Sequence, residues 1–451
     1  MINPEKKLVE FITDTELSDV PRVAKERVQK SLLDTLGAGI AGSGTRAGEI
    51  IADFVTEVWK GGEATVFLNG RSSTVGASLA NGYMANALDI DDGGKHTRGH
   101  PGAQLVPAAL ALCEQEDKSG EDLLSALAIG YETAHRVGGC WHSTYEDYRS
   151  CGSWGAVACA AVGAKLLGLS EEKTRNSLAI ADYNSPYLPM NRALEHPSMV
   201  KHGAGAGSMT GIMAAEWAAR GFTGPSTTLT EGNCGKFFED LGDHFVLSES
   251  NAVEYKDIPS CSWGHPAIKA AQELIEGHDI AVEDIGQIEV EGFTEMASLY
   301  DPVPSTEEEA QFSVKWPLTA AIVDGEVTPE NTSPIGFDDP EKIALFEKIE
   351  VSASDKLDRM NRSVSRGEGE TSAWPSRVRI RTKDGETLDS GVTLAEGDKE
   401  VPFDQLTKKF VRLTAPYLSN RRAQEIIQAA REVETLANME RITSPIRGRE
   451  Q

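Results

Sequence analysis

The chain has 451 residues, with 44 Lys or Arg against 70 Asp or Glu and a formal net charge of −26 at pH 7. Its 40% hydrophobic and 25% charged residues are an ordinary globular composition, and its length suffices for two or three domains. The acidic excess argues against nucleic acid and against an anionic membrane as partners, because both are bound by clustered Lys and Arg.

The acidic residues are unevenly distributed, since residues 201–400 alone carry 38 acids and 17 bases. This pattern predicts an acidic surface of the kind that suits a high-salt, halophilic cytoplasm. No apolar run approaches the roughly 20 residues of a membrane helix, and the N-terminus lacks a signal core. The six cysteines are scattered without a Cys-x-x-Cys pair, so we expect reduced thiols and a cytoplasmic location.

The first part of the chain reads as a series of helices. Apolar residues between Val23 and Leu36 recur with a helical period, and Ser119 and Ser170 precede acidic first turns as helix caps do. Further helices are predicted at 103–115, 121–137, 155–167 and 207–220. Because several of these segments are rich in small residues on more than one side, we expect closely packed, buried helices.

The pattern changes after residue 285. Alternating apolar and polar residues predict strands at 285–293 and 348–353, and a hairpin around the Asp384-Gly385 turn joins 377–382 to 387–392. Helical patterns are found at 306–323 and again at 404–437. The predicted fold is therefore mostly α: a large all-helical domain formed by both chain ends (1–268 and 396–451), with an inserted smaller α+β lid domain (269–395).

The densest polar cluster lies at 89–100, between two helical segments. It holds three carboxylates, two histidines, a lysine and an arginine, and so offers acids, bases and cations together. The alternative is a polar connection with Asp caps and glycine turns; Asp92 is equally well a helix cap.

A glycine-alternating segment, 199–207, contains Lys201 and His202 and runs into a helix. Its backbone amides could bind an anion beside Lys201. A linker with close helix packing would explain the same glycine pattern. The spacing is neither a phosphate loop nor a dinucleotide fingerprint. We expect His96 and His202 to be solvated loop residues.

Two later segments contain further candidate functional residues. Lys256, Cys261 and His265 fall within ten residues, but Cys-x-x-x-His alone is weak evidence for zinc. Trp316 follows Ala-Gln-Phe-Ser at 310–313 and precedes a small-residue helix.

Together these segments resemble the MmgE/PrpD family, which contains 2-methylcitrate dehydratases, cis-aconitate decarboxylases and an iminodisuccinate epimerase. The similar motifs run in consistent order from about residue 5 to residue 415. They are Leu-Asp-Ile-Asp-Asp at 88–92, His-Pro-Gly at 100–102, Gly-Ser-Trp-Gly at 152–155, Lys-Leu-Leu-Gly-Leu at 165–169, the Lys256–His265 motif and Ala-Gln-Phe-Ser at 310–313.

The resemblance implies a helical domain that carries the site, an α+β lid and a homodimer. It also implies chemistry without metal or cofactor on a small di- or tricarboxylate. Carried over by position, the resemblance gives six active-site candidates: Asp89, His100, Lys201, Lys256, Cys261 and His265. We predict catalytic roles for His100, Asp89, Lys201, Lys256 and His265, and substrate binding by Arg149, Cys261, Asp91 and Trp316.

Within this set we predict that His100 transfers the proton, oriented by Asp89 or Asp91. Lys201, Lys256 and Arg149 would hold substrate carboxylates. His265 would be the second acid or a partner of Asp89, and Cys261 part of the pocket wall.

Three positions depart from decarboxylase-like members of the family. Gly93 stands in place of a threonine, Arg149 in place of a histidine and Trp316 in place of a tyrosine. The departures disfavour cis-aconitate decarboxylation. The leading prediction is a hydro-lyase of the 2-methylcitrate dehydratase type. The alternatives are an epimerase, a decarboxylase, a metal-dependent hydrolase built on the 89–100 cluster, and a non-catalytic relative.

Overall fold

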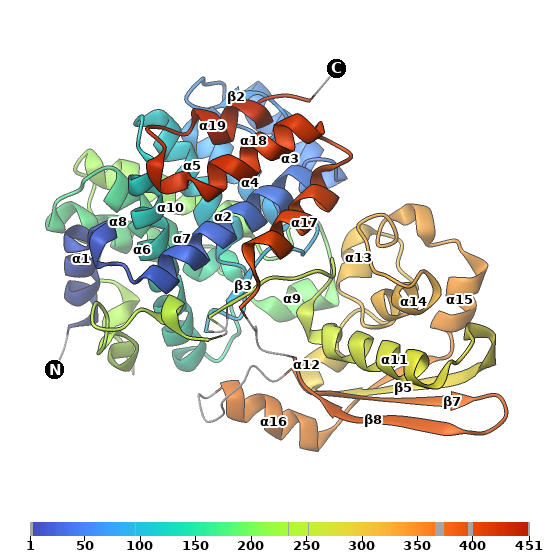
Figure 1. Ribbon diagram of the computed structural model, residues 1–451. Coiled ribbons are helices and arrows are strands. Elements are labelled where there is room, and N and C mark those ends of the chain that lie inside the picture. Colours follow the sequence, from blue (N-terminus) through green and yellow to red (C-terminus); the bar gives the residue numbers. More distant parts are fainter. Residues whose placement is uncertain are drawn as a thin grey trace. The chain divides into compact units, whose positions relative to one another are not determined.

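The computed structural model describes residues 3–94, 96–232, 234–250, 252–365, 374–395 and 400–449, and its chain divides into two compact units (Figure 1). The first unit comprises Met1–Met190, Val200–Tyr255 and Glu400–Gln451. The second comprises Asn191–Met199 and Lys256–Lys399. The chain therefore contributes Asn191–Met199 to the second unit, forms the rest of that unit from Lys256 to Lys399 and then returns to the first unit, whereas the sequence predicted a boundary at residue 268.

The first unit is built from helices with a few two-residue strands. Its helices are α1 (Pro4–Asp14), α2 (Arg22–Gly42), α3 (Arg46–Val58), α4 (Thr74–Asn86), α5 (Gly102–Gln115), α6 (Gly120–Thr144), α7 (Cys151–Leu166), α8 (Glu171–Asn184), α10 (Ala204–Ala219), α17 (Phe403–Thr414), α18 (Asn420–Arg431) and α19 (Glu440–Thr443). Its strand pairs are β1 (Ala64–Thr65) with β2 (Arg71–Ser72), and β3 (Gly93–Gly94) with β4 (Val253–Glu254). Helix α9 (Met190–Glu195) begins at the last residue of the first segment of this unit.

Small residues allow the central helices to approach closely. Helix α7 packs against α5, α6, α8 and α10, and nearly all of its residues are buried. A Cβ added at Gly211 of α10 would lie 2.4 Å from Cβ of Cys159, and one at Gly163 of α7 would lie 2.6 Å from Cβ of Ala215. The predicted close packing of buried, small-residue helices is confirmed.

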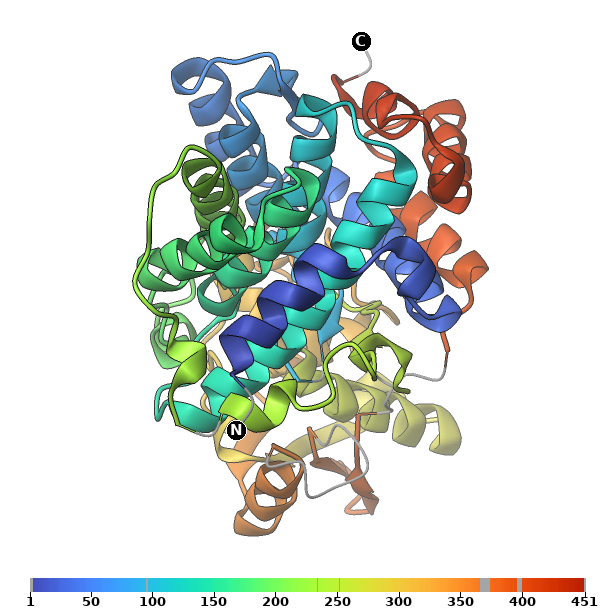
Figure 2. The same ribbon diagram turned by 90° about the vertical axis from the view of Figure 1, so that its left-hand side faces the viewer.

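Helices from the two ends of the chain lie side by side. α17 and α18 pack against α2 (Figure 1), while α1 packs against α7 and α8 (Figure 2). The predicted caps are present, since the hydroxyl oxygens of Ser119 and Ser170 accept hydrogen bonds from the backbone N–H groups of Asp122 and Lys173.

The second unit combines a four-stranded sheet with helices. The sheet has the order β6-β5-β7-β8, with β5 parallel to β6 and antiparallel to β7, and β7 antiparallel to β8. Its strands are β5 (Ile285–Gly292), β6 (Ile349–Ala353), β7 (Ser376–Thr382) and β8 (Thr387–Thr393), and its helices are α11 (His265–His278), α12 (Thr294–Ala297), α13 (Glu307–Gln311), α14 (Lys315–Val323), α15 (Pro340–Phe346) and α16 (Asp355–Ser365). The β7–β8 hairpin turns at Asp384-Gly385, where Gly385 has a φ of 101° that favours glycine. The mostly α fold class with a small α+β portion is confirmed.

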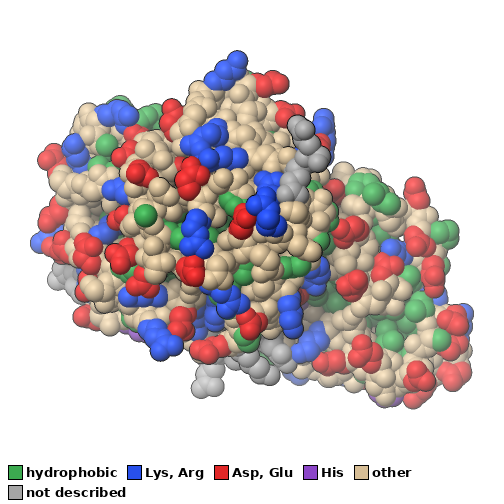
Figure 3. All heavy atoms as spheres, turned by 45° about the horizontal axis from the view of Figure 1, so that its top comes forward, with side chains coloured by type: hydrophobic (Ala, Val, Ile, Leu, Met, Phe, Trp, Pro, Cys, Tyr) green, Lys and Arg blue, Asp and Glu red, His purple; other side chains and the backbone are tan. Residues whose placement is uncertain are grey.

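The charged side chains differ between the two units on the face drawn in Figure 3. Lys and Arg alternate with Asp and Glu over the first unit, whereas acidic side chains predominate over the second. None of the described helices is long and apolar enough to cross a bilayer.

One expectation about the cysteines is wrong. Cys140 at the end of α6 and Cys234 form a disulfide across 94 positions of sequence, with a Cα–Cα distance of 4.8 Å. The sequence around each cysteine could not predict this disulfide, because the two residues come close only in the folded chain. The other four cysteines are buried and form no disulfide.

Candidate active site in the first unit

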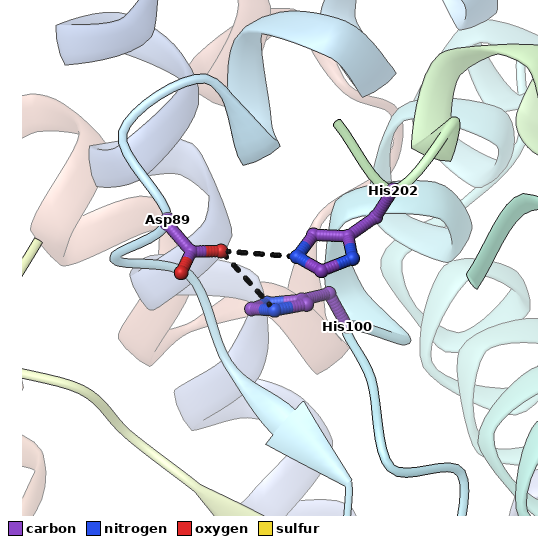
Figure 4. Close-up of side chains that lie close together, drawn as sticks. All are labelled: Asp89, His100 and His202. Atoms are coloured by element: carbon purple, nitrogen blue, oxygen red, sulfur yellow. Dashed lines mark ion pairs between the residues drawn. The ribbon is translucent and has the colours of Figure 1, made fainter. Parts of the chain in front are cut away.

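Two connections between helices bring the predicted acid–base residues together. Asp89 and Asp91 follow α4, His100 precedes α5, and Lys201 directly precedes His202 just before α10. All five side chains are buried, with exposed fractions of at most 7% per residue. Figure 4 shows one oxygen of Asp89 facing the neighbouring rings of both His100 and His202.

The imidazole of His100 lies between two carboxylates. Its Nε2 is 3.3 Å from Oδ1 of Asp89, and its Nδ1 is 3.0 Å from Oδ2 of Asp91. Both carboxylate side chains are at most 1% exposed, whereas the His100 side chain keeps 9% exposure. A small molecule that approaches the cluster therefore meets the imidazole before the carboxylates.

Lys201 supplies the amino group of the cluster. Its Nζ lies 3.8 Å from Oδ1 of Asp89 and donates hydrogen bonds to the backbone oxygens of Asn86 and Ala87, at 2.8 and 3.2 Å. These carbonyls belong to the end of α4, where the helix dipole favours a cation. Lys201 thus joins the carboxyl end of α4 to the carboxylate of Asp89.

The backbone is left-handed at two residues of the cluster. Asp89 has a φ of 53° and Lys201 a φ of 44°. Such a conformation costs on the order of 1 kcal/mol or more at a residue other than glycine, and it persists where the surroundings hold it. Strained residues concentrate at functional sites, which supports a chemical role for these two.

Two buried contacts hold the carboxylate of Asp91 and the backbone of Ile90, which lies between Asp89 and Asp91. Asn86 Nδ2 donates to Oδ1 of Asp91 at 3.0 Å. Lys409 of α17 donates to the backbone oxygen of Ile90 and to Oδ1 of Asp34 in α2, both at 2.6 Å. A lysine near the end of the chain therefore anchors the peptide between Asp89 and Asp91.

The burial of Asp34 has an electrostatic consequence. Desolvation raises the pKa of its carboxyl to about 7, and Lys409 opposes part of this rise. The sequence offered no signal for this contact, because 375 positions separate the two residues.

The thiol of Cys151 fixes the backbone of His100. The N–H of His100 donates to Sγ at 3.1 Å, and a Cβ at the preceding Gly99 would lie only 2.5 Å from the same sulfur. Burial raises the pKa of Cys151 to about 12, so its thiol stays protonated at neutral pH. This cysteine is a packing and hydrogen-bonding residue.

Asp92 acts as a cap of α5. Its Oδ1 accepts from the N–H of Gly102 at 2.8 Å, and its other oxygen accepts from the hydroxyl of Tyr131. Desolvation raises the pKa of this carboxyl to about 6. Of the two interpretations offered for Asp92, these contacts favour the cap.

His202 was expected to be solvated, and this expectation is wrong. The residue is 6% exposed; its Nε2 lies 3.4 Å from Oδ1 of Asp89, and its Nδ1 lies 3.0 Å from Oγ of Ser150. Its ring is 4.8 Å from the ring of His100. The signal in the sequence was its position beside Lys201, whereas nothing in the local text singled out Ser150.

Arg149 lies among aromatic rings. Its guanidinium carbon is 3.9 Å from the ring centre of Tyr145, and 5.4 and 5.3 Å from those of Trp141 and Tyr187. Such cation–π contacts orient a guanidinium while leaving its N–H groups available to an anion. Its predicted contact with a substrate carboxylate stays a prediction.

The remaining predicted residues belong to the second unit. Lys256 and Cys261 are buried there, and Nε2 of His265, at the start of α11, lies 3.1 Å from the backbone oxygen of Ser260. Trp316 is fully buried, with its ring against Phe337 and its indole N–H donating to the oxygen of Asn331 at 3.0 Å. These contacts give Trp316 a core role in that unit, and the functional assignments of all four stay predictions.

The described part of the chain contains one group of residues suited to a metal ion. Donor atoms of Asp89, His100 and His202 lie within 4.8 Å of one another, and an Asp-His-His set is of the kind that zinc uses. The ammonium of Lys201 beside Asp89 opposes the binding of a cation at that oxygen. We therefore keep the metal-free assignment as a prediction to be tested with chelator.

The fold and the site define a class: a mostly helical chain of two units whose first unit carries a buried cluster of carboxylates, imidazoles and a lysine. The chain matches the MmgE/PrpD N-terminal domain at residues 6–244 and the MmgE/PrpD C-terminal domain at residues 258–435. It belongs to the MmgE/PrpD family.

Curated relatives are distant in sequence and match this chain over about two thirds or more of their length. The chain is 24% identical to the Cis-aconitate decarboxylase-like protein oryM of Aspergillus oryzae, over 99% of this chain and 98% of that protein. It is 25% identical to the Cis-aconitate decarboxylase of Homo sapiens (94% and 90%) and 26% identical to that of Mus musculus (72% and 70%).

Proposed function

We propose that this protein is a lyase that acts on a small di- or tricarboxylate by proton transfer next to a carboxylate, with dehydration of the 2-methylcitrate type as its leading reaction. Family membership and decarboxylase-named relatives support a lyase-type enzyme. The observation that carries the proposal is the His100 imidazole held between the buried carboxylates of Asp89 and Asp91.

In the proposed reaction His100 takes the proton from the carbon next to a substrate carboxylate. Two neighbouring carboxylates increase the affinity of an imidazole for a proton, which makes His100 a stronger base. Negative charge then develops on the substrate carboxylate, and the ammonium of Lys201 stabilises it. The bond to the hydroxyl group breaks, and protonated His100 gives its proton to the departing hydroxyl, which leaves as water and returns His100 to its starting state.

A substrate screen tests the proposal. Thermal-shift measurements in high salt with 2-methylcitrate, citrate, cis-aconitate and iminodisuccinate should show stabilisation by a ligand of this class. Mass spectrometry of the products should then show a loss of about 18 mass units for dehydration. His100→Gln should abolish turnover while retaining the thermal shift. Binding without turnover by the wild-type protein would overturn the assignment as an enzyme.

Decarboxylation of cis-aconitate is the second candidate, favoured by the names of the relatives. A loss of about 44 mass units would identify it, and exchange of substrate hydrogen for deuterium without mass loss would identify an epimerase. The departures at Gly93 and Arg149 count against decarboxylation, and the structure makes them testable. A Cβ at Gly93 would meet no atom closer than 3.7 Å, so a side chain fits there.

We therefore expect the double variant Gly93→Thr/Arg149→His to gain release of carbon dioxide from cis-aconitate. The matched control Gly93→Val/Arg149→His has nearly the same shape but lacks the hydroxyl. Gly94→Ala is the contrasting control, because its Cβ would lie 2.4 Å from Oγ1 of Thr97 and should destabilise the fold. Equal release of carbon dioxide by the threonine and valine variants would show that the threonine hydroxyl does not contribute to decarboxylation.

A further inference from the structure

His202 and Ser150 form a chain of contacts that ends on the carboxylate used by His100. Oγ of Ser150 lies 3.0 Å from Nδ1 of His202, and Nε2 of His202 lies 3.4 Å from Oδ1 of Asp89. That same oxygen lies 3.3 Å from Nε2 of His100. Two imidazoles therefore meet one carboxylate oxygen, as Figure 4 shows.

The direction of these hydrogen bonds follows from the charge of His202. Burial lowers the pKa of this imidazole to about 4, so the ring is neutral at pH 7 and carries a single N–H. A carboxylate only accepts, so the proton lies on Nε2, and Nδ1 then accepts from the hydroxyl of Ser150.

The placement of Ser150 agrees with this arrangement. It is the N-cap residue of α7, yet its side chain makes no capping hydrogen bond. Its hydroxyl thus contacts His202 in place of the helix amides that an N-cap serine ordinarily serves.

We propose that Ser150 and His202 are positioning residues, which act through Asp89 to set the proton affinity of His100. The inference rests on the proposed function, in which His100 transfers the proton. An N–H donated by His202 withdraws negative charge from Asp89 and so weakens the hold of that carboxylate on a proton at His100. Without it, two carboxylates would retain the proton and slow its transfer to or from substrate.

Other charged and titratable groups also act on His100, and the comparison between variants must hold them constant. In the described part of the chain, Asp89, Asp91, His202 and Cys151 contact His100, and Lys201 acts on it through Asp89. The backbone around His202 is held independently of its ring, because its oxygen accepts from the N–H of Gly152 at 3.0 Å and Gly203 donates to Val200 at 2.8 Å. Replacing the ring therefore leaves the loop anchored.

The direct test is an NMR titration of the histidine Cε1–H signals in the ligand-free protein, with the His100 signal identified by its loss in His100→Gln. His202→Leu removes both hydrogen bonds, and we expect the titration midpoint of His100 to rise by about one pH unit. His202→Gln keeps an N–H within reach of Asp89 and should leave the midpoint near its wild-type value. Equal midpoints in the wild type and His202→Leu would overturn the inference.

Ser150 gives a second variant with little risk to folding, because it makes no capping bond. Ser150→Ala should raise the His100 midpoint by a smaller amount, and Ser150→Thr should restore it. Ser119→Ala is the matched control: it removes a serine that does cap its helix, so it should lower the melting temperature and leave the His100 midpoint unchanged. The opposite pattern would assign Ser150 to helix stability alone.

The activity readout separates this inference from the proposed function. In a protein that turns over substrate, the acidic limb of the kcat profile of His202→Leu should move upward with the His100 midpoint. A protein that shows the NMR shift but no turnover with any acid would refute the function and keep the positioning role. Turnover with no shift in either readout would refute the positioning role and keep the function.

Discussion

Replacing Lys409 with Met removes the cation that links α17 to α2 and to the peptide between Asp89 and Asp91. Its Nζ lies 2.6 Å from both Oδ1 of Asp34 and the oxygen of Ile90, and the side chains of Lys409 and Asp34 are 3% and 0% exposed. Loss of one partner of a buried ion pair costs about 3 kcal/mol of the free energy of unfolding when the other stays charged. We expect this full cost only at alkaline pH.

The pH dependence follows from the carboxyl of Asp34. Its pKa is raised from 3.8 to about 7 in the folded protein, so the folded state binds more protons between these values and the contribution of Asp34 to stability falls as pH rises through that window. In the wild type this fall ends near pH 7. Without Lys409 the pKa rises further, so the fall continues by about 1.4 kcal/mol per pH unit above 7.

The assay is urea unfolding of the wild type and Lys409→Met at pH 6 and pH 8. We expect the difference in unfolding free energy to be roughly 1 to 2 kcal/mol larger at pH 8. The matched control is Lys342→Met in the second unit: Nζ of Lys342 also lies 2.6 Å from its carboxylate, but Asp324 is 29% exposed, so its cost should be about 1 kcal/mol or less at both values. A Lys409→Met cost that is equal at pH 6 and pH 8 would refute the reasoning.

Three further outcomes are expected. Arg149→His should raise KM about tenfold and lower kcat less, because the guanidinium among the aromatic rings is predicted to bind a substrate carboxylate; an unchanged KM would count against that contact. Excess chelator should leave turnover intact, whereas a loss restored by Zn²⁺ would assign the Asp89–His100–His202 group to a metal. Affinity for the polyanionic substrate should rise from low to moderate ionic strength, because salt screens the net charge of −26; a steady fall would mean that local cations dominate.

The regular elements were accessible from the sequence where one local pattern determined them. The Ala- and Leu-rich text at 103–115 became α5 (Gly102–Gln115), and the Asp384-Gly385 signal marked the β7–β8 turn. Helix α2 runs on through Gly37 and Gly39 to Gly42, because those glycines meet Phe410 and Phe67 in the core. Their tertiary contacts override their low helix propensity.

The site was accessible only in part. Asp89 and His100 stand in one short polar segment, and Lys201 was found by its glycine-rich loop. Ser150 and Lys409 reach the cluster through folding alone, since they come from α7 and α17, far from the 89–100 segment in sequence. Whether a histidine such as His202 is solvated or buried depends on its tertiary neighbours, which a local pattern does not contain.

The Cys140–Cys234 disulfide encloses half of the candidate site in a covalent ring. The residues between its two ends include Arg149, Ser150, Lys201 and His202, whereas Asp89 and His100 lie outside. On a chain-entropy account, closing a loop of this length removes about 4 to 5 kcal/mol of disorder from the unfolded chain. Proteolytic cleavage of the chain between Cys140 and Cys234 would give two fragments that stay joined by the disulfide. The residues of the candidate site would then separate only after the disulfide is reduced.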